Sequence, residues 1–402
     1  MKKQITFAYT IASPQRKELK ILYWQYFFTP PGGWGNRRSY DFARYWRAAG
    51  HEVWILAGGT YFPQSYLSKS RAFRTADGVP IVWLPTPYHQ RQKTFGRLWS
   101  FLRFTAWSLY ILWRLRARNL YLIATLPPPF LPIAGALERL LTGRRFSVEV
   151  FDAWPQVLSA KLPPLLYAPL SMLMRWSFRQ ADYLFALSPD IRAYLPSKVR
   201  VLVSYNGTHT ELFRRRKRPS FLPFRVIYAG TIGWVNHLSF LIEVAKALRN
   251  YPAIEFWILG DGAEKPKVIE LARGLASVRF FEPVPVEEVP YWLSECHIGV
   301  SLVRPIPILF SNSANKFYDY LANGLVVGVN YGGWQAEVIR SIRCGFSAPS
   351  VYSFAAGILR YYGDRAAWER AAERARLWAV AHYDRRRLSE EISALLKEEE
   401  KA

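Results

Sequence analysis

Cysteine is scarce in this sequence, since Cys296 and Cys344 are the only two among 402 residues. They stand far apart and form none of the C-x-x-C spacings of zinc sites, so the sequence predicts neither a disulfide framework nor a cysteine-based metal site. This fits a reducing compartment, and we expect a cytoplasmic protein. Near the N-terminus, Lys and Arg follow a short apolar stretch too soon for a signal peptide, so none is expected.

Long uncharged apolar runs are also missing from the most hydrophobic part of the chain. The longest one in the aromatic, arginine-rich segment 96–119 covers only residues 104–113, which is too short to span a bilayer. With half of the residues hydrophobic and 16% aromatic, the chain can nevertheless bury large cores. We therefore expect a globular protein without membrane-spanning helices.

Acidic residues are too few to balance the basic ones, and the formal net charge is +24. Residues 1–215 hold 30 Lys and Arg against 10 Asp and Glu, whereas residues 216–402 hold 24 against 20. The first half is therefore expected to meet an anionic partner, either nucleic acid, anionic lipid or a phosphorylated substrate. The sequence contains no recognised nucleic-acid-binding motif, and its basic residues are mixed with bulky apolar ones, so we do not expect nucleic acid.

Apolar runs of strand length alternate with helical patterns along the whole chain. This alternation predicts an α/β protein with two doubly wound, Rossmann-like domains in tandem. The basic, proline-containing segment 214–223 interrupts the pattern and is expected to be a linker. The predicted domains cover residues 1–213 and 224–380, and a C-terminal helix over 381–402 can pack back on the first domain.

Glycine-rich loops follow several predicted strands. The first, TPPGGWGNRRSY at 29–40, has three glycines within four positions, and others occur at 230–233, 260–262 and 332–333. Such a loop can be a tight turn or can let a phosphate approach the backbone beside a helix N-terminus. Parallel strands carry these loops at their carboxyl edges, so loops from both domains are expected to face one cleft.

Seven motifs occur in an order and spacing that resemble a known family. They are GGWGNRRSYDFARYWRAAGHEVWILAGG, ATLPPPF, EVFDAWPQV, SYNGTHTELF, IYAGTIG, ILGDG and NKFYDYLANGLVVGVNYGG, which lie within residues 21–375. Together they resemble family-4 glycosyltransferases of the GT-B fold, and most of all the bacterial N-acetylfucosamine-type transferases of surface-polysaccharide synthesis. The resemblance implies two domains facing across a cleft and metal-independent, retaining transfer of a sugar from a nucleotide diphosphate, with a UDP-sugar as the expected donor. It implies no cofactor, and the acceptor would be a saccharide or a polyprenyl-diphosphate-linked sugar.

The departing diphosphate needs neutralisation, and without a metal ion this falls to cations, backbone amide groups and helix dipoles. Lys316, at a predicted helix start, is the expected phosphate contact, and the resemblance assigns the ribose hydroxyls to Asp319. Asp152, after a strand and before a proline, can hold sugar hydroxyls or cap a helix; with Lys316 it is the predicted catalytic pair. The predicted donor-binding residues are Gly33, Gly35, Gly230, Thr231, Gly233, Gly260, Asp261, Gly262, Arg304, Asn315, Lys316 and Asp319.

Several positions depart from the family pattern. Ser311 stands where an acidic residue is common, and Thr231 and Asn236 stand where the family often has an arginine and a lysine. Phe151 replaces an arginine before Asp152. These departures leave open a reduced activity or a non-catalytic relative.

Two segments, 96–119 and 163–180, combine aromatic and aliphatic residues with arginine. Such helices suit a membrane interface, although ordinary core helices can have the same composition. We expect the first domain to dock on the inner face of the cytoplasmic membrane, close to a lipid-linked acceptor. The predicted membrane or acceptor contacts are Arg37, Arg38, Trp107, Leu112 and Trp113.

Two other functions remain compatible with parts of the sequence. A nicotinamide-dependent oxidoreductase would explain a glycine-rich first turn, but GGWGNR is not G-x-G-x-x-G and no well-placed acidic residue follows. A non-catalytic membrane- or polysaccharide-binding protein would explain the charge, but not a cleft between two domains.

Overall fold

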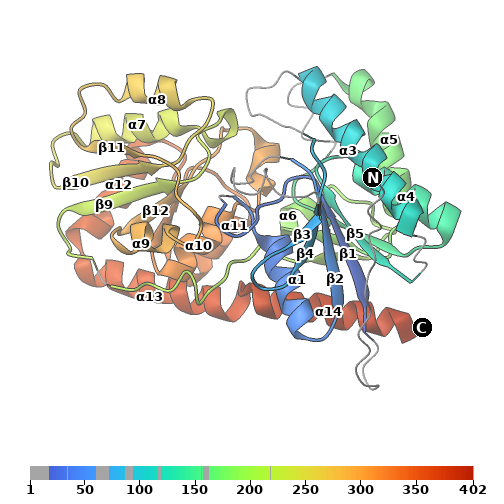
Figure 1. Ribbon diagram of the computed structural model, residues 1–402. Coiled ribbons are helices and arrows are strands. Elements are labelled where there is room, and N and C mark those ends of the chain that lie inside the picture. The colour runs from blue at the N-terminus through green and yellow to red at the C-terminus, as the bar shows by residue number, and fades with distance from the viewer. Residues whose placement is uncertain are drawn as a thin grey trace.

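The computed structural model describes residues 18–401 except 34, 60–71, 87–93, 116–118, 155, 157–162 and 218. Two α/β domains lie side by side, and two long helices near the C-terminus run along one side of both of them (Figure 1). Each domain has its own parallel sheet with helices on both faces. This confirms the predicted doubly wound architecture.

The first domain contains an eight-stranded sheet in the order β3-β4-β2-β1-β5-β6-β7-β8. Only β3 runs antiparallel to its neighbour. The strands are β1 (Lys20–Gln25), β2 (Glu52–Ala57), β3 (Ala72–Arg74), β4 (Pro80–Trp83), β5 (Tyr121–Leu126), β6 (Phe146–Val150), β7 (Leu184–Ala186) and β8 (Val201–Val203). The helices are α1 (Arg38–Ala48), α3 (Thr94–Leu115), α4 (Phe130–Thr142), α5 (Pro164–Gln180) and α6 (Pro189–Arg192).

Strand β1 shows why the central strands are mostly apolar and do not alternate with polar residues. Ile21 and Tyr23 pack in one core with residues of α1, whereas Leu22 and Trp24 pack in the other with residues of α3, α4 and α5. A strand covered on both faces takes apolar side chains at consecutive positions rather than at alternate ones. β5 and β6 are likewise buried at every residue.

The second domain contains a six-stranded, wholly parallel sheet in the order β11-β10-β9-β12-β13-β14. Its strands are β9 (Phe224–Ala229), β10 (Ile254–Leu259), β11 (Val278–Phe281), β12 (Ile298–Ser301), β13 (Val326–Val329) and β14 (Gly345–Ser347). Its helices are α7 (Leu238–Ala247), α8 (Lys265–Leu271), α9 (Val289–Ser294), α10 (Asn315–Asn323), α11 (Trp334–Ile342), α12 (Val351–Gly363) and α13 (Arg365–His382), with short 3-10 turns η2 (Trp234–Asn236) and η3 (Pro307–Ser311).

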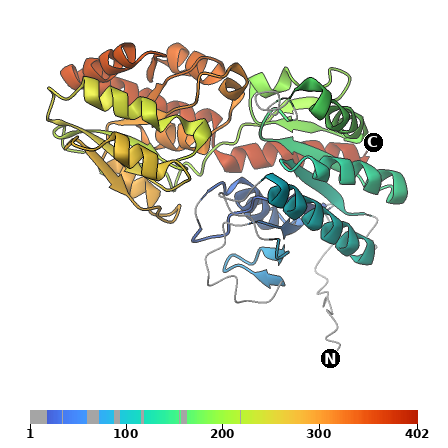
Figure 2. The ribbon, with the colours of Figure 1, turned by 90° about the horizontal axis from the view of Figure 1, so that it is seen from above.

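The helix that follows the second domain returns to the first. α14 (Arg385–Lys401) lies among the elements of the first domain when the molecule is seen from above (Figure 2). Its Leu388, Ile392 and Leu396 are buried in the same core as α1, and the indole Nε1 of Trp46 donates a hydrogen bond to the carbonyl of Ser389 at 2.7 Å. α14 therefore forms part of the cover of the first sheet.

Helix α3 has one buried and one exposed face. Phe104 and Leu112 are fully buried, whereas Trp99, Trp107 and Trp113 are 62%, 45% and 60% exposed. The prediction that Leu112 contacts a membrane is therefore wrong, because helical periodicity turns it toward the core, away from Trp107 and Trp113. No helix in the described part of the chain is long and apolar enough to cross a membrane.

Arg38, predicted to contact the acceptor or the membrane, lies inside the first domain instead. Its guanidinium is fully buried, pairs with Glu149 of β6 at 2.9 Å and donates to the Ser204 hydroxyl at 2.8 Å. It also donates to the carbonyl of Tyr205 and lies over the ring of Phe42. That prediction is wrong because the start of α1 points Arg38 across the sheet edge rather than outward.

This burial makes Arg38 a test of stability. Arg38→Met leaves the Glu149 carboxylate buried without its cation, which we expect to lower the free energy of unfolding by about 3–5 kcal/mol. The double variant R38M/E149L removes both charges and should recover most of that loss. Chemical denaturation followed by circular dichroism measures both variants, and an unchanged midpoint for R38M would contradict the structural role.

Candidate active site

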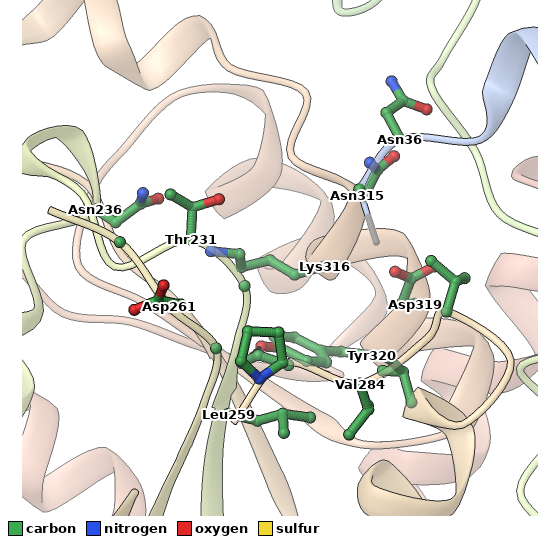
Figure 3. A pocket seen from close by; sticks show the side chains of 18 of the residues that line it. Asn36, Thr231, Asn236, Leu259, Asp261, Val284, Asn315, Lys316, Asp319 and Tyr320 are labelled. Atoms are coloured by element: carbon green, nitrogen blue, oxygen red, sulfur yellow. Dashed lines mark hydrogen bonds between the residues drawn. The ribbon is translucent and has the colours of Figure 1, made fainter. Parts of the chain in front are cut away.

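A cavity of about 1090 Å³ lies between the two domains. The first domain contributes loops after β1, β5 and β6, and the second contributes loops after β9, β10 and β11 together with α10. All of these loops leave the carboxyl ends of parallel strands, where ligands bind in folds of this kind. Figure 3 shows that α10 and the loops after β9 and β10 supply most of the polar side chains on the second-domain side.

Lys316 reaches into this cavity from the first turn of α10 (Figure 3). Its Nζ donates to the Tyr228 hydroxyl at 2.7 Å and lies 3.9 Å from the centre of that ring. No carboxylate pairs with it among the described residues. Burial lowers the pKa of Lys316 to about 7, because the protonated form is poorly solvated there. An anion placed beside it would restore the charged form.

The glycine loops after β9 and β10 pack directly against each other. A Cβ atom on Gly260 would lie 2.0 Å from the carbonyl oxygen of Gly230, and one on Gly262 would lie 2.3 Å from that of Ile232. Both glycines have positive φ angles, near +149° and +159°. A Cβ on Gly230 would stand 3.1 Å from Lys316 Nζ. Glycine is therefore required here for close backbone approach, and the same approach leaves backbone next to the Lys316 ammonium.

Asp319 lies one helical turn after Lys316 and also lines the cavity. Its Oδ1 accepts a hydrogen bond from the Thr208 hydroxyl at 2.6 Å. Burial raises the pKa of Asp319 to about 7, against an opposing effect of the nearby Arg385 guanidinium. A half-buried carboxyl beside a cation can accept hydrogen bonds from two neighbouring hydroxyl groups of a ligand.

Asp152 lines the first-domain wall, in the loop after β6. No described residue hydrogen-bonds to its carboxylate, so the alternative of a helix cap is not observed within the described part of the chain. Its side chain is exposed to the cavity, and partial desolvation by the cavity walls raises its pKa to about 6. A carboxyl group with that pKa can accept or release a proton near neutral pH.

The opening glycine loop is both a turn and a cavity wall. Gly35 and Asn36 line the cavity, and a Cβ on Gly35 would lie 2.9 Å from the Thr29 hydroxyl. Gly33 instead bridges the domains, because its carbonyl accepts from the Val286 amide at 3.3 Å. Arg37 extends the same bridge through an ion pair with Glu287.

The predicted site residues thus fall into two groups. Those that line the cavity are Asp152, Gly35, Gly230, Thr231, Gly260, Asp261, Gly262, Asn315, Lys316 and Asp319. Gly33, Gly233, Arg304, Arg37 and Arg38 are not among its described lining residues. The predicted ligand contacts of the second group are therefore not supported.

Arg304 and Gly333 were expected to face the cavity because each follows a strand, but each serves another contact. Arg304 pairs with Glu264 at 3.1 Å and stacks over the Trp234 ring, so its charge is already compensated outside the cavity. Gly333 follows β13 as expected, but it packs against the Asp190 carboxylate, which accepts from the Trp334 amide at 3.0 Å. That glycine loop serves the contact between the domains.

Positions that depart from the family pattern divide in the same way. Thr231 and Asn236 line the cavity. Ser311 does not line the cavity. Its hydroxyl donates a hydrogen bond to the carbonyl of Ile308, and its own carbonyl accepts one from the Ser188 hydroxyl of the first domain. Among the described residues, no group of three or more His, Cys, Asp or Glu side chains is placed to hold a metal ion.

Arg385 is a site residue that the sequence analysis missed. Its guanidinium lines the cavity, pairs with Asp41 of α1 at 2.8 Å and donates to the Asn315 side chain at 3.1 Å. In the sequence it is one of three consecutive arginines that read as a solvated charge run. An apolar wall was missed as well: Leu259, Pro283, Val284, Val286, Val289, Leu293 and Tyr320 line the second-domain side.

Comparisons with known proteins agree with this architecture. Residues 35–207 match the family described as glycosyl transferase 4-like domain, and residues 223–364 match the family described as glycosyl transferases group 1. The chain is 22% identical over 372 residues to WcaI of Escherichia coli, described as a colanic acid biosynthesis glycosyl transferase, with 85% of this chain and 91% of WcaI covered.

Solved structures with the same fold cover nearly the whole chain. Sucrose-phosphate synthase from Thermosynechococcus elongatus superposes with a TM-score of 0.73 at 14% identity, covering 94% of this chain and 98% of that one. HepE from Anabaena, solved with UDP-glucose, gives a TM-score of 0.68 at 15% identity, covering 95% and 100%. At such identities the likeness establishes the fold. With both domain families matched in order along a shared fold, the chain is a glycosyltransferase of the GT-B fold.

Proposed function

We propose that this chain is a retaining, metal-independent glycosyltransferase that moves a sugar from a UDP-sugar to a saccharide or lipid-linked acceptor in cell-surface polysaccharide synthesis. The observation that carries the proposal is Lys316, a cation without a carboxylate partner among the described residues, at the start of a helix in the cavity between the domains. The UDP-glucose bound by HepE and the colanic acid role described for WcaI support the donor and the pathway class.

In this proposal the second domain neutralises the leaving diphosphate. The Lys316 ammonium, the N-terminal end of α10 and the backbone of the loop after β9 surround the place where its charge develops. Asp319 accepts hydrogen bonds from the ribose hydroxyls, and the apolar wall formed by Leu259, Val284 and neighbouring residues takes the base. Binding the diphosphate raises the pKa of Lys316, so the cation is fully formed when the donor is seated.

The first domain would present the acceptor. Asp152 faces the cavity from that side, and its pKa near 6 suits a group that accepts the proton of an acceptor hydroxyl. The resemblance to N-acetylfucosamine-type transferases makes such a sugar the first donor to try. Retention of configuration rests on that resemblance and is checked by the anomeric proton coupling of the product.

We further propose that the first domain docks on an anionic membrane, which would bring a lipid-linked acceptor to the cavity. The neighbouring helices α4 and α5 also expose apolar residues, namely Leu140, Leu141, Leu165, Met172 and Leu173. Arg103 and Arg114 of α3 and Arg175 and Arg179 of α5 are exposed as well. Aromatic and aliphatic groups beside cations combine insertion with attraction to anionic lipid, at about 1 kcal/mol for each cation near the surface.

The donor site is tested with UDP and a panel of UDP-sugars. Lys316→Ala should weaken UDP binding by about 1.5–3 kcal/mol, because a charge-assisted contact to phosphate is lost. Lys246→Ala, a surface lysine of the same domain paired with Glu243, is the matched control and should bind normally. Calorimetry measures binding, mass spectrometry detects transfer, and both should persist in EDTA. Equal binding by the two variants would remove the proposed donor site.

The pKa of Lys316 predicts a pH dependence of UDP binding. The free ammonium loses its proton above about pH 7, whereas bound diphosphate holds that proton, so affinity should fall by up to about tenfold per pH unit above 7. Titration calorimetry in buffers of different ionisation enthalpy should show about one proton taken up at pH 8.

Two variants assign that proton. Lys316→Arg keeps its positive charge throughout this pH range, so its UDP affinity should no longer fall as the pH rises above 7. Asp319→Asn removes the other group titrating near pH 7 and should leave the slope in place. A slope that disappears with Asp319→Asn and persists in Lys316→Arg would assign the proton to the carboxyl group instead.

Membrane docking is tested with the tryptophans of α3. The triple variant W99S/W107S/W113S should no longer sediment with anionic vesicles, while its melting temperature and UDP binding persist, because these side chains are exposed. Leu112→Ser, on the buried face of the same helix, should lower the melting temperature. Vesicle binding of the unaltered protein should weaken with salt but not vanish. A folded triple variant that still sediments completely with the vesicles would refute the proposal.

A further inference from the structure

A second cavity, of about 490 Å³, lies in the second domain. It is open to solvent and is lined by the C-terminal ends of α11 and α12, the start of β14 and the first half of α13, and four of its arginine residues are exposed. Five of its nine lining residues are arginines, and a buried tyrosine, an isoleucine, an alanine and a glycine complete the wall. The arginines are Arg340, Arg343, Arg360, Arg370 and Arg374, and the others include Tyr361, Ile339 and Ala367.

These arginines have no acidic counterpart in the described structure. No carboxylate lines the cavity, and none of the five forms an ion pair with a described residue. Elsewhere in the same domain arginines are paired, as Arg225 is with Glu255 and Arg365 with Glu369. Glu337, Glu369 and Glu373 belong to α11 and α13 but do not line the cavity. The positive charge is therefore concentrated and uncompensated.

Ordinary structural roles account for only part of the cluster. Arg340 and Arg360 lie in the last turns of α11 and α12, where cations favour the helix dipole. Arg374 donates two hydrogen bonds to the carbonyl of Arg343, at 2.6 and 3.2 Å. Neither role is served by the guanidinium groups of Arg343 and Arg370. Five cations around one small space repel one another, and an anion between them would relieve that repulsion.

We propose that this cavity binds a soluble small molecule carrying two or more phosphate groups. Guanidinium groups match phosphate oxygens with paired hydrogen bonds, and the volume lies within the range of small-molecule sites. Tyr361 is held on the wall by its hydroxyl bond to the Gly345 carbonyl at 3.3 Å, so the site also has a fixed apolar surface. The ligand is distinct from the sugar donor of the proposed function.

The second cavity lies away from both the donor cavity and the helices proposed to dock on a membrane. It lies where β14 begins and where α11 and α12 end, which is the edge of the sheet opposite to the donor cavity. α12 and the start of α13 also lie away from α3 and α5 in both views (Figures 1 and 2). A lipid headgroup in the membrane on which α3 docks would therefore not reach it. The expected effect of the ligand is on the second domain itself.

Titration calorimetry with inorganic tripolyphosphate tests the site in the full chain carrying Lys316→Ala, which removes the donor-site cation. One binding event is expected, and R343Q/R370Q should weaken it by about tenfold or more, because two charge-assisted contacts are lost. Arg365→Gln, on the same helix but paired with Glu369 outside the cavity, is the matched control and should change the affinity by less than about twofold. Thermal melts confirm that each variant is folded.

Three results would overturn the proposal whether or not the chain binds UDP. They are the absence of tripolyphosphate binding in the Lys316→Ala protein, equal affinity in R343Q/R370Q, and an equal loss in Arg365→Gln, which would indicate unspecific attraction. Vesicles containing phosphatidic acid test whether the arginines bind the phosphate of a lipid rather than that of a soluble molecule. Their binding should be the same with and without R343Q/R370Q, and a loss confined to vesicles would assign the arginines to a membrane instead.

Discussion

The buried guanidinium of Arg385 contacts three parts of the molecule at once. From the start of α14 it pairs with Asp41 of α1, donates to the carbonyl of Asn206 in the loop after β8, and donates to Asn315 at the start of α10. A buried charge is stable only when its donors are satisfied, so these partners are held at fixed distances from one another. The same group opposes the rise of the Asp319 pKa. One side chain therefore contributes both to the relative position of the domains and to the charge state of Asp319.

The cavity between the domains combines a poorly solvated cation with backbone packed too closely for any side chain. Lys316 is surrounded by protein and by the loop at Gly230, and the Gly260 and Gly262 backbones support that loop from behind. The cost of desolvating the ammonium is met when the protein folds, before a ligand arrives. A site that is already arranged needs little reorganisation when negative charge develops in it, which is the condition for electrostatic stabilisation of a leaving group.

Sequence reasoning was most accurate where local chemistry decides the structure. Each strand predicted from an apolar run exists, while β3 and β14 were missed because their three-residue sequences, AFR and GFS, form no apolar run. Lys316 and Asp152 were expected at the cavity because they lie at a helix start and a strand end, whereas Asp319 was expected there from the family resemblance, and all three line it. Arg38 and Arg385 could not be placed, because a guanidinium buried against a partner more than a hundred residues away leaves no local pattern. Leu112 was wrongly expected to contact a membrane for a different reason. The composition of its segment does not show which face of the helix each residue occupies, and Leu112 lies on the buried face.

The return of α14 to the first domain has a consequence for the order in which the protein is made. The core beneath α1 includes Leu388, Ile392 and Leu396, so part of that face of the first sheet stays uncovered while the ribosome synthesises the entire second domain. Domains generally fold as they emerge, and apolar surface exposed in the meantime promotes association with other chains. The first domain must therefore wait, partly complete, for a helix encoded after its neighbour. Its maturation is tied to the completion of the second domain, and a nascent chain halted between the two would be a natural client of chaperones.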